Sequence, residues 1–127
     1  MTKKDILNLL EKYDLNKKEF IILSGASLVL QDVKEETRDI DITVSEYLYN
    51  KLLNDYNCIF EKEVNNYLVW FIDDIINFSI HYYDEIEYID YNGYKIQSLE
   101  SILKLKESLN RDKDKSDIEK IKRLIKK

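Results

Sequence analysis

An alternating segment over residues 38–44 constrains most strongly what this chain can fold into. Its even positions from 40 onward are isoleucine or valine, while its odd positions hold Asp39, Asp41 and Thr43. Because neighbouring side chains of a strand point to opposite faces, the apolar residues face a core and both carboxylates leave the other face. Two carboxylates held side by side repel each other unless a divalent cation neutralises them. The segment therefore predicts a strand that carries a solvated acidic face, which is the commoner case, or a metal site.

A second feature lies upstream, where an apolar run over residues 19–23 ends at Ser24 and Gly25, the glycine standing fourteen residues before Asp39. We expect a buried strand that turns directly into a short helix over residues 26–31. The N–H groups and the positive dipole end of such a helix bind phosphate, and glycine lets the backbone approach a ligand closely. Ser24 and Ser27 can add hydroxyl donors. A glycine at such a turn more often has no ligand, so both interpretations stay open for this feature alone.

The rest of the chain alternates between helical and strand patterns. Thr2 with Asp5 is typical of a helix start, Ser45 and Ser98 of N-caps, and Asn92-Gly93 of a tight hairpin. We expect helices over residues 2–14, 45–55, 99–109 and 115–126, and strands over 57–63, 67–72, 75–83, 86–90 and 94–97. This order predicts an α/β (α+β) fold, a mixed sheet flanked by helices with two C-terminal helices. Without a linker or a repeat, we expect residues 1–127 to form a single domain.

Composition excludes several classes of protein. Hydrophobic residues make up 44% of the 127 positions and aromatic residues 12%, which argues against disorder. Cys58 is the only cysteine, so an intramolecular disulfide or a cysteine-based zinc site is excluded. We expect a reducing, cytoplasmic location. The longest uncharged run, residues 20–31, is too short for a bilayer, so we expect no membrane association.

Charge is distributed unevenly along the chain. Residues 104–127 contain ten basic and five acidic side chains, whereas the whole chain has a formal net charge of −5, so residues 1–103 carry −10. An acidic body argues against an extended nucleic-acid surface, which needs a basic footprint. It does not exclude a local phosphate site, and it suits a basic protein partner.

Together, the two informative features resemble a known family. Ser24-Gly25-x-x-Leu28, followed by Thr37-Arg38-Asp39-Ile40-Asp41-Ile42, is similar to the signature of the DNA-polymerase-β-like nucleotidyltransferase superfamily. Its small stand-alone members, which include antibiotic nucleotidyltransferases and toxin–antitoxin or abortive-infection proteins, are the most similar. The resemblance implies a nucleotidyltransferase-like fold. It also implies a triphosphate at Ser24 and Gly25, with Ser27 nearby, and catalytic Mg²⁺ on Asp39 and Asp41.

The C-terminal segment extends this resemblance to about residues 20–121. Leu103-Lys104-Leu105-Lys106 and Arg111-x-Lys113-Asp114-x-x-Asp117-Ile118 resemble the helices that close many such domains. Lys104, Lys106, Arg111 and Lys113 could then reach a triphosphate, and Lys113 is our candidate among them for nucleotide binding. As solvated charges on helices they need no function, and for each of them singly this is the favoured interpretation.

The clearest departure from the family concerns its third carboxylate, which normally stands on a later strand beside the aspartate pair. On the expected strand 75–83, the position falls on Asn77. An amide cannot accept a proton from a hydroxyl group and is a poorer magnesium ligand. Asp73 or Asp74 could substitute only if the register shifts. His81, on the same expected face, is either a replacement general base or, as we favour, a partly exposed strand histidine.

Two functions of different classes follow. The first is a Mg²⁺-dependent nucleotidyltransferase that moves a nucleoside monophosphate from an NTP to an unidentified acceptor hydroxyl, with Asp39, Asp41 and Asn77 at the catalytic centre. The alternative is an inactive homologue that binds a protein as an antitoxin, regulatory subunit or inhibitor, which Asn77 and the acidic body favour. A structural domain without a ligand is a third option. A homodimer or a partner that presents the acceptor fits a chain of this size.

Overall fold

The computed structural model describes residues 1–81 and 83–126. Its elements follow the order α1 (Lys3–Tyr13), η1 (Lys17–Glu19), β1 (Phe20–Ile22), α2 (Ser24–Leu30), β2 (Ile40–Val44), α3 (Glu46–Asp55), β3 (Ile59–Val64), β4 (Tyr67–Ile72), β5 (Ile76–Ser79), β6 (Tyr88–Tyr91), β7 (Tyr94–Gln97), α4 (Leu99–Leu109), η2 (Asp112–Asp114) and α5 (Lys115–Ile125). None of the helices in this described part has the length and apolar character that a bilayer crossing requires.

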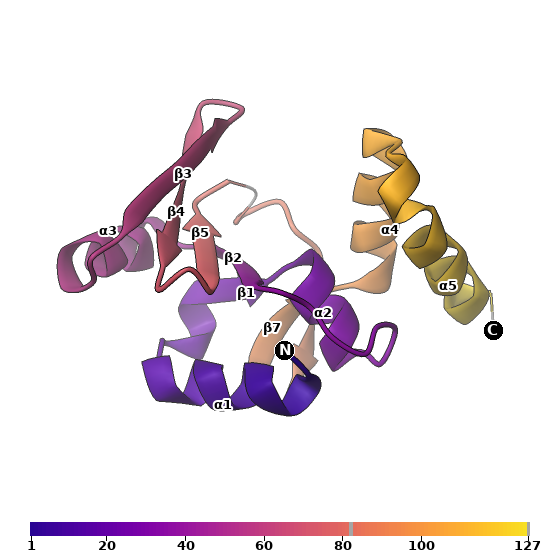
Figure 1. Ribbon diagram of the computed structural model, residues 1–127, viewed down its shortest axis with the longest axis horizontal. Helices are drawn as coiled ribbons and strands as arrows, with labels where there is room; N and C mark the ends of the chain where they lie inside the picture. The colour runs from indigo at the N-terminus through magenta and orange to yellow at the C-terminus, as the bar shows by residue number, and fades with distance from the viewer. Residues whose placement is uncertain (82, 127) are drawn as a thin grey trace.

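The strands form one mixed sheet of seven strands in the order β3-β4-β5-β2-β1-β7-β6. β2 runs parallel to β5, and β1 runs parallel to β7, while the other neighbours are antiparallel. Helices flank this sheet, and α4 and α5 stand beside it as a separate pair (Figure 1). The expected fold class, a mixed sheet with flanking and C-terminal helices, is confirmed.

Local sequence signals set most element ends. Thr2 and Asp5 form a reciprocal capping box at α1, and Ser45 and Ser98 cap α3 and α4 through their hydroxyl groups. Asn92 and Gly93 both have left-handed backbones, as a two-residue hairpin between β6 and β7 requires. The helices and the hairpin therefore lie where the sequence predicts them, to within a few residues.

The main core lies on one face of the sheet. Ile40, Ile42 and Val44 of β2 are buried there against Ile6 and Leu10 of α1 and Leu48 and Leu52 of α3. Asp41, between the two isoleucines, therefore leaves the opposite face. A smaller cluster of Leu28, Val33, Ile102 and Ile121 fastens α4 and α5 to α2. The helices α1 and α3 thus cover one face of the sheet. The Asp41 side chain lies on the opposite face, where α1 and α3 do not cover it.

Several element boundaries differ from expectation, and three of them concern the elements that carry the expected site residues. Helix α2 begins at Ser24, two residues early, while β2 begins at Ile40, so that Asp39 precedes the strand. β5 ends at Ser79 rather than at residue 83, because its ladder with β2 stops at the pair of Thr43 and Ser79. Beyond that pair, the Thr43 hydroxyl donates to the His81 carbonyl at 2.7 Å and replaces the ladder. Tyr82, which falls within the strand expected over residues 75–83, lies outside the described residues.

Candidate functional site

Asp41 and Asn77 are direct neighbours on the parallel strands β2 and β5. The expected register therefore holds, and Asn77 stands where the resemblance places a third acid. Both residues line a cavity of about 210 Å³, together with Ser24 from the start of α2. Three of the residues that the sequence singles out thus meet in one hollow of the uncovered sheet face.

The cavity collects residues from almost the whole length of the chain. Its lining is Leu23, Ser24, Asp41, Ile42, Thr43, Lys62, Val64, Val69, Asn77, Phe78, Ser79, His81 and Leu105. Because ligand pockets usually measure ~300–1,000 Å³, this hollow suits the reacting groups of a ligand rather than a whole nucleotide. The remainder of a nucleotide would extend beyond it.

Asp41 has an unfavourable environment for a carboxylate. Burial, followed by the negative charges of Asp39 and Glu61, raises the pKa of Asp41 from 3.8 to about 6, and Lys62 opposes this shift. Asp39 itself is half-buried just before β2. The negative charge of Asp39 contributes to the raised pKa of Asp41. This agrees with two carboxylates that face the same side. A bound cation would relieve this concentration of negative charge.

Asn77 is held by a contact that the sequence does not reveal. Its Nδ2 donates to Oε2 of Glu61 at 2.8 Å, whereas its buried Oδ1 has no hydrogen-bond partner. Asp73 and Asp74 do not replace it, because both form the left-handed turn between β4 and β5. The Tyr13 hydroxyl also donates to Asp73. These two aspartates therefore lie away from the cavity.

The residues present fit a magnesium ion that is completed by other ligands. Within residues 1–81 and 83–126, no group of three or more histidine, cysteine or acidic side chains lies close enough to hold a metal by itself. Mg²⁺ typically takes one or two carboxylates and keeps waters or phosphate oxygens in its other positions. Asp41, with the unpartnered amide oxygen of Asn77 beside it, supplies that kind of oxygen donor, and Asp39 lies outside the cavity lining but close enough for its charge to act on Asp41.

The turn at Ser24 and Gly25 is built differently from the expected phosphate loop. Ser24 has a left-handed backbone with φ of 40°, and its N–H donates to Oε1 of Gln97 at 2.9 Å. A Cβ on Gly25 would lie 2.8 Å from the Thr37 hydroxyl oxygen. The glycine is therefore required by the Thr37 segment, whatever ligand approaches. Helix α2 starts without a capping side chain at Leu23, and Gln97 already accepts the hydrogen bond of the Ser24 N–H.

Ser27 and Lys113 are not brought to the cavity. Ser27 is fully buried, and its hydroxyl donates to the Gln97 carbonyl at 2.7 Å, so it fastens α2 to β7. Lys113 is exposed on η2 and is absent from the cavity lining. Both expectations of a nucleotide contact lack support in this arrangement.

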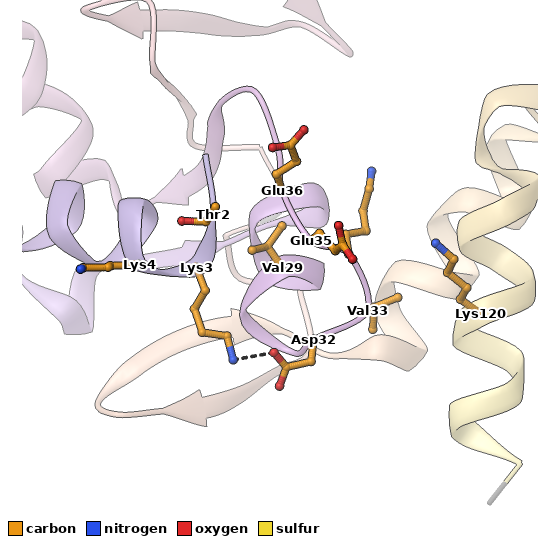
Figure 2. A pocket seen from close by; sticks show the side chains of 10 residues that line it. Thr2, Lys3, Lys4, Val29, Asp32, Val33, Glu35, Glu36 and Lys120 are labelled. Carbon is orange, nitrogen blue, oxygen red and sulfur yellow. Dashed lines mark ion pairs between the residues drawn. The ribbon is translucent and has the colours of Figure 1, made fainter.

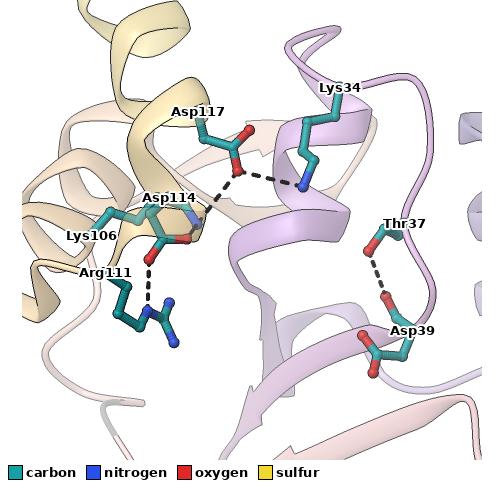
Figure 3. A network of polar contacts seen from close by, with 7 residues as sticks. All are labelled: Lys34, Thr37, Asp39, Lys106, Arg111, Asp114 and Asp117. Atoms are coloured by element: carbon teal, nitrogen blue, oxygen red, sulfur yellow. Dashed lines mark hydrogen bonds and ion pairs between the residues drawn. The ribbon is translucent and has the colours of Figure 1, made fainter.

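The C-terminal motif forms an ion network instead of a cationic surface (Figure 3). Lys106 is buried, and its Nζ lies 2.8 Å from Asp114 and 3.6 Å from Asp117. Arg111 contacts Asp114 at 2.7 Å, and Lys34 contacts Asp117 at 3.4 Å. Burial alone would raise the pKa of Asp114, but hydrogen bonds from Lys106 and Arg111 hold that pKa below its ordinary value. The motif thus joins α4, η2 and α5 to the loop of Lys34.

His81 lines the cavity from a turn, not from a strand as the sequence suggested. Its ring stacks on Tyr67 with centroids 4.8 Å apart. Burial lowers the pKa of His81, while Glu85 opposes this shift. Burial thus favours the uncharged form of the ring, and its stacking on Tyr67 places it at the β4 side of the site.

Sequence reasoning missed Glu61, Lys62 and Gln97. The register between β3 and β4 shifts between Phe60 and Lys62, which marks a β-bulge. Charged residues on an edge strand ordinarily protect the edge from pairing, so Glu61 and Lys62 gave no functional signal. Buried Gln97 holds the Ser24 turn and also donates to Ser101 at 2.9 Å. Only the sheet order reveals these contacts.

A larger hollow of about 750 Å³ lies between the start of α1 and residues 32–36 (Figure 2). Lys3 and Asp32 form an ion pair of 2.7 Å across it, and the Asp32 side chain is 79% exposed. None of the site residues expected from the sequence lines this hollow. Its charges are of both signs and lie in solvent, so it gives no indication of a ligand.

Comparison with known proteins agrees with this geometry. The family model of a nucleotidyltransferase of unknown function, DUF6036, matches residues 2–127. No curated protein sequence matches the chain significantly.

Two solved structures share the fold. One is a protein of Thermotoga maritima proposed to be a nucleotidyltransferase, with a TM-score of 0.59 and 20% identity over 100% of this chain and 97% of that one. The other is the Megavirus polyadenylate synthase, with a TM-score of 0.59 and 12% identity over 94% of this chain. This chain spans 30% of the polyadenylate synthase.

Proposed function

Because the chain belongs to the family described as nucleotidyltransferase of unknown function, DUF6036, we propose that it binds an NTP with Mg²⁺ and transfers the nucleoside monophosphate to an acceptor hydroxyl. The observation that carries the proposal is the cavity in which Asp41, Asn77 and Ser24 meet. A second support is the pKa of Asp41, which burial and the neighbouring carboxylates raise to about 6. This shift indicates a concentration of negative charge that a bound cation would neutralise.

In this proposal the aspartates bind the metal ion and the turn at the start of α2 binds the triphosphate. Asp39 and Asp41 hold the metal, and the Ser24–Gly25 turn lies against the triphosphate. When bound, Mg²⁺ neutralises charge on the transferring phosphoryl group. Lys62, which also lines the cavity, supplies a positive charge to the phosphates. The acceptor oxygen bonds to the α-phosphorus, the bond from α-phosphorus to the bridging oxygen breaks, pyrophosphate leaves, and the hydroxyl proton passes to solvent.

Label transfer tests this activity without knowledge of the acceptor. The wild type and Asp39→Ala/Asp41→Ala are each incubated with Mg²⁺, an extract from the source cells and NTPs that carry the label on the α-phosphate. We expect the wild type to move label into a macromolecular or small-molecule product and the double variant to stay at background. Equal labelling by both proteins would contradict the assignment of Asp39 and Asp41.

A second candidate function is that of an inactive homologue that binds a protein. Asn77 at the place of the third acid and the −10 charge of residues 1–103 favour it. An acidic body steers toward a basic partner, and such steering weakens as salt rises. If wild type neither moves label nor binds nucleotide, and a basic partner binds it in a salt-dependent manner, this second function replaces the first.

A further inference from the structure

We propose that Glu61 is a positioning residue of this site, which fixes the Asn77 amide with its oxygen toward the Asp41 side. The pair of Glu61 and Asn77 then takes the place of the third carboxylate. The proposal deepens the proposed function and rests on it, because it concerns the same metal and nucleotide. Glu61 comes from β3, two strands away from Asn77 in the sheet.

The β-bulge is the first observation that supports this role. Val69 and Phe71 of β4 stand on the same sheet face as Asn77, because Phe71 is paired with Asn77. On β3, Lys62 is paired with Val69 and Ile59 with Phe71. Glu61 has no partner on β4 and is therefore the extra residue of the bulge. Bulges commonly re-aim a side chain beside an active site. Here the bulge lets Glu61 reach over β4 to Asn77.

The hydrogen bond between the two side chains is the second observation. An ionised carboxylate only accepts hydrogen bonds, so the Asn77 NH₂ must be the group that faces Glu61, at 2.8 Å. The amide oxygen therefore points the other way. It is buried without a partner, and Asn77 is only 9% exposed. Unpartnered buried polar atoms are rare in native proteins and often mark a site for an ion or a water.

Charge is the third observation. The Glu61 carboxylate lies 2.8 Å from the Asn77 amide nitrogen, and Asn77 stands directly beside Asp41 in the sheet. Glu61 thus adds a carboxylate behind the amide and not a third metal ligand, because no three acidic side chains of the described residues lie close enough to share a metal, while the neutral amide of Asn77 is the neighbour of Asp41 in the sheet. A partner that fixes the orientation of a metal ligand typically affects metal affinity by ~10–100-fold.

Binding of Mn²⁺, measured by electron paramagnetic resonance in the presence of a non-hydrolysable NTP analogue, tests this inference. Mn²⁺ is the probe because it reports free and bound metal without turnover. We compare the wild type with Glu61→Ala and with the matched control Glu63→Ala, which removes the same charge from an exposed position of the same strand. We expect Glu61→Ala to weaken Mn²⁺ binding roughly tenfold and Glu63→Ala to leave it within about twofold.

A swapped variant separates positioning from a merely structural role. Glu61→Gln/Asn77→Asp restores a hydrogen-bonded amide and carboxylate with their places exchanged, and should bind Mn²⁺ at least as tightly as the wild type. Circular dichroism confirms that each variant folds. Wild-type affinity in Glu61→Ala, or failure of the folded swapped variant to recover affinity, would overturn the role of Glu61. If the wild type itself binds no Mn²⁺ with the analogue, the proposed function fails, which is a different result.

Discussion

Asp41 and Asn77 lie side by side on neighbouring parallel strands, a carboxyl group of raised pKa beside an amide whose buried oxygen has no partner. Both are electron-rich groups in a partly water-excluded hollow, and both are costly to keep there without a cation. Sites that store such costs are commonly functional, because a ligand relieves them on binding. The stability of the protein should therefore respond to changes at these two positions in a defined way.

Asp41→Asn should stabilise the protein in the absence of metal at about pH 8. The rise of the Asp41 pKa from 3.8 to about 6 corresponds to a cost on the order of 2–3 kcal/mol for ionising the folded protein. The folded state keeps the proton more tightly than the unfolded state, so wild-type stability falls as pH rises through this window. Denaturant unfolding of both proteins at several pH values measures the difference.

The gain from Asp41→Asn should shrink as pH falls and vanish well below pH 3.8, where Asp41 is protonated in both states. Thr43→Val, on the same strand, is a suitable comparison, because it loses a hydrogen bond but has no titrating group. A gain that is independent of pH, or a loss of stability at high pH, would contradict the assigned electrostatics of Asp41.

Gly25→Ala should destabilise the protein by ~1–3 kcal/mol, because its new methyl group would meet the Thr37 hydroxyl oxygen at 2.8 Å. The same change made together with Thr37→Ala should be neutral or stabilising relative to Thr37→Ala alone, since alanine is the better helix former. Thermal unfolding of the four proteins measures the coupling. Equal costs of Gly25→Ala in both backgrounds would show that Thr37 is not the reason for the glycine.

Ser24→Gly should stabilise the protein by ~0.5–1 kcal/mol, because Ser24 has a left-handed backbone that costs little only for glycine. Ser24→Ala serves as the control, since it keeps the strain while removing the hydroxyl group. We expect the denaturant midpoint of Ser24→Gly to lie above that of Ser24→Ala, because only the glycine variant relieves the backbone strain. If both variants have the same stability, the strain at this turn is negligible.

Lys106→Ala should cost ~3 kcal/mol, because it removes one of the two cations that pair with the buried carboxylate of Asp114 and leaves only Arg111. The exposed pair of Lys115 and Asp112 is the matched control, and Lys115→Ala should cost less than ~0.5 kcal/mol. The pKa of Asp114 is lowered in the fold. The contribution of the pair is therefore present at neutral pH and is lost as pH falls through that lowered pKa. Chemical unfolding at neutral and acid pH tests both statements.

Much of the fold is encoded in local patterns. The alternation that ends at Val44, the serine caps and the Asn92-Gly93 turn depend on residues within one or two turns of each other, and each occupies its expected place. The alternation of each strand also predicts that Asp41 and Asn77 point away from the core, whereas their direct pairing was implied only by the family resemblance.

The remainder depends on contacts between distant elements. Glu61 reaches Asn77 only because β3, β4 and β5 are neighbours and β3 has a bulge, and no periodicity reveals a bulge in an edge strand. Lys106 was expected to be solvated or near a phosphate, yet it is buried in an ion network that joins α4, η2 and α5. Helical spacing cannot predict such a network, since the interhelical packing decides it.

The thermal unfolding midpoint in the presence of Mg²⁺ and each of the four NTPs measures nucleotide binding at Asp39 and Asp41 most directly. A ligand that binds only the folded state stabilises it, by about 2.7 kcal/mol at a hundred times its dissociation constant. We predict that at least one NTP raises the midpoint of the wild type and that Asp39→Ala/Asp41→Ala loses this shift. No shift at millimolar NTP, or an equal shift in the double variant, would contradict a nucleotidyltransferase site at these aspartates.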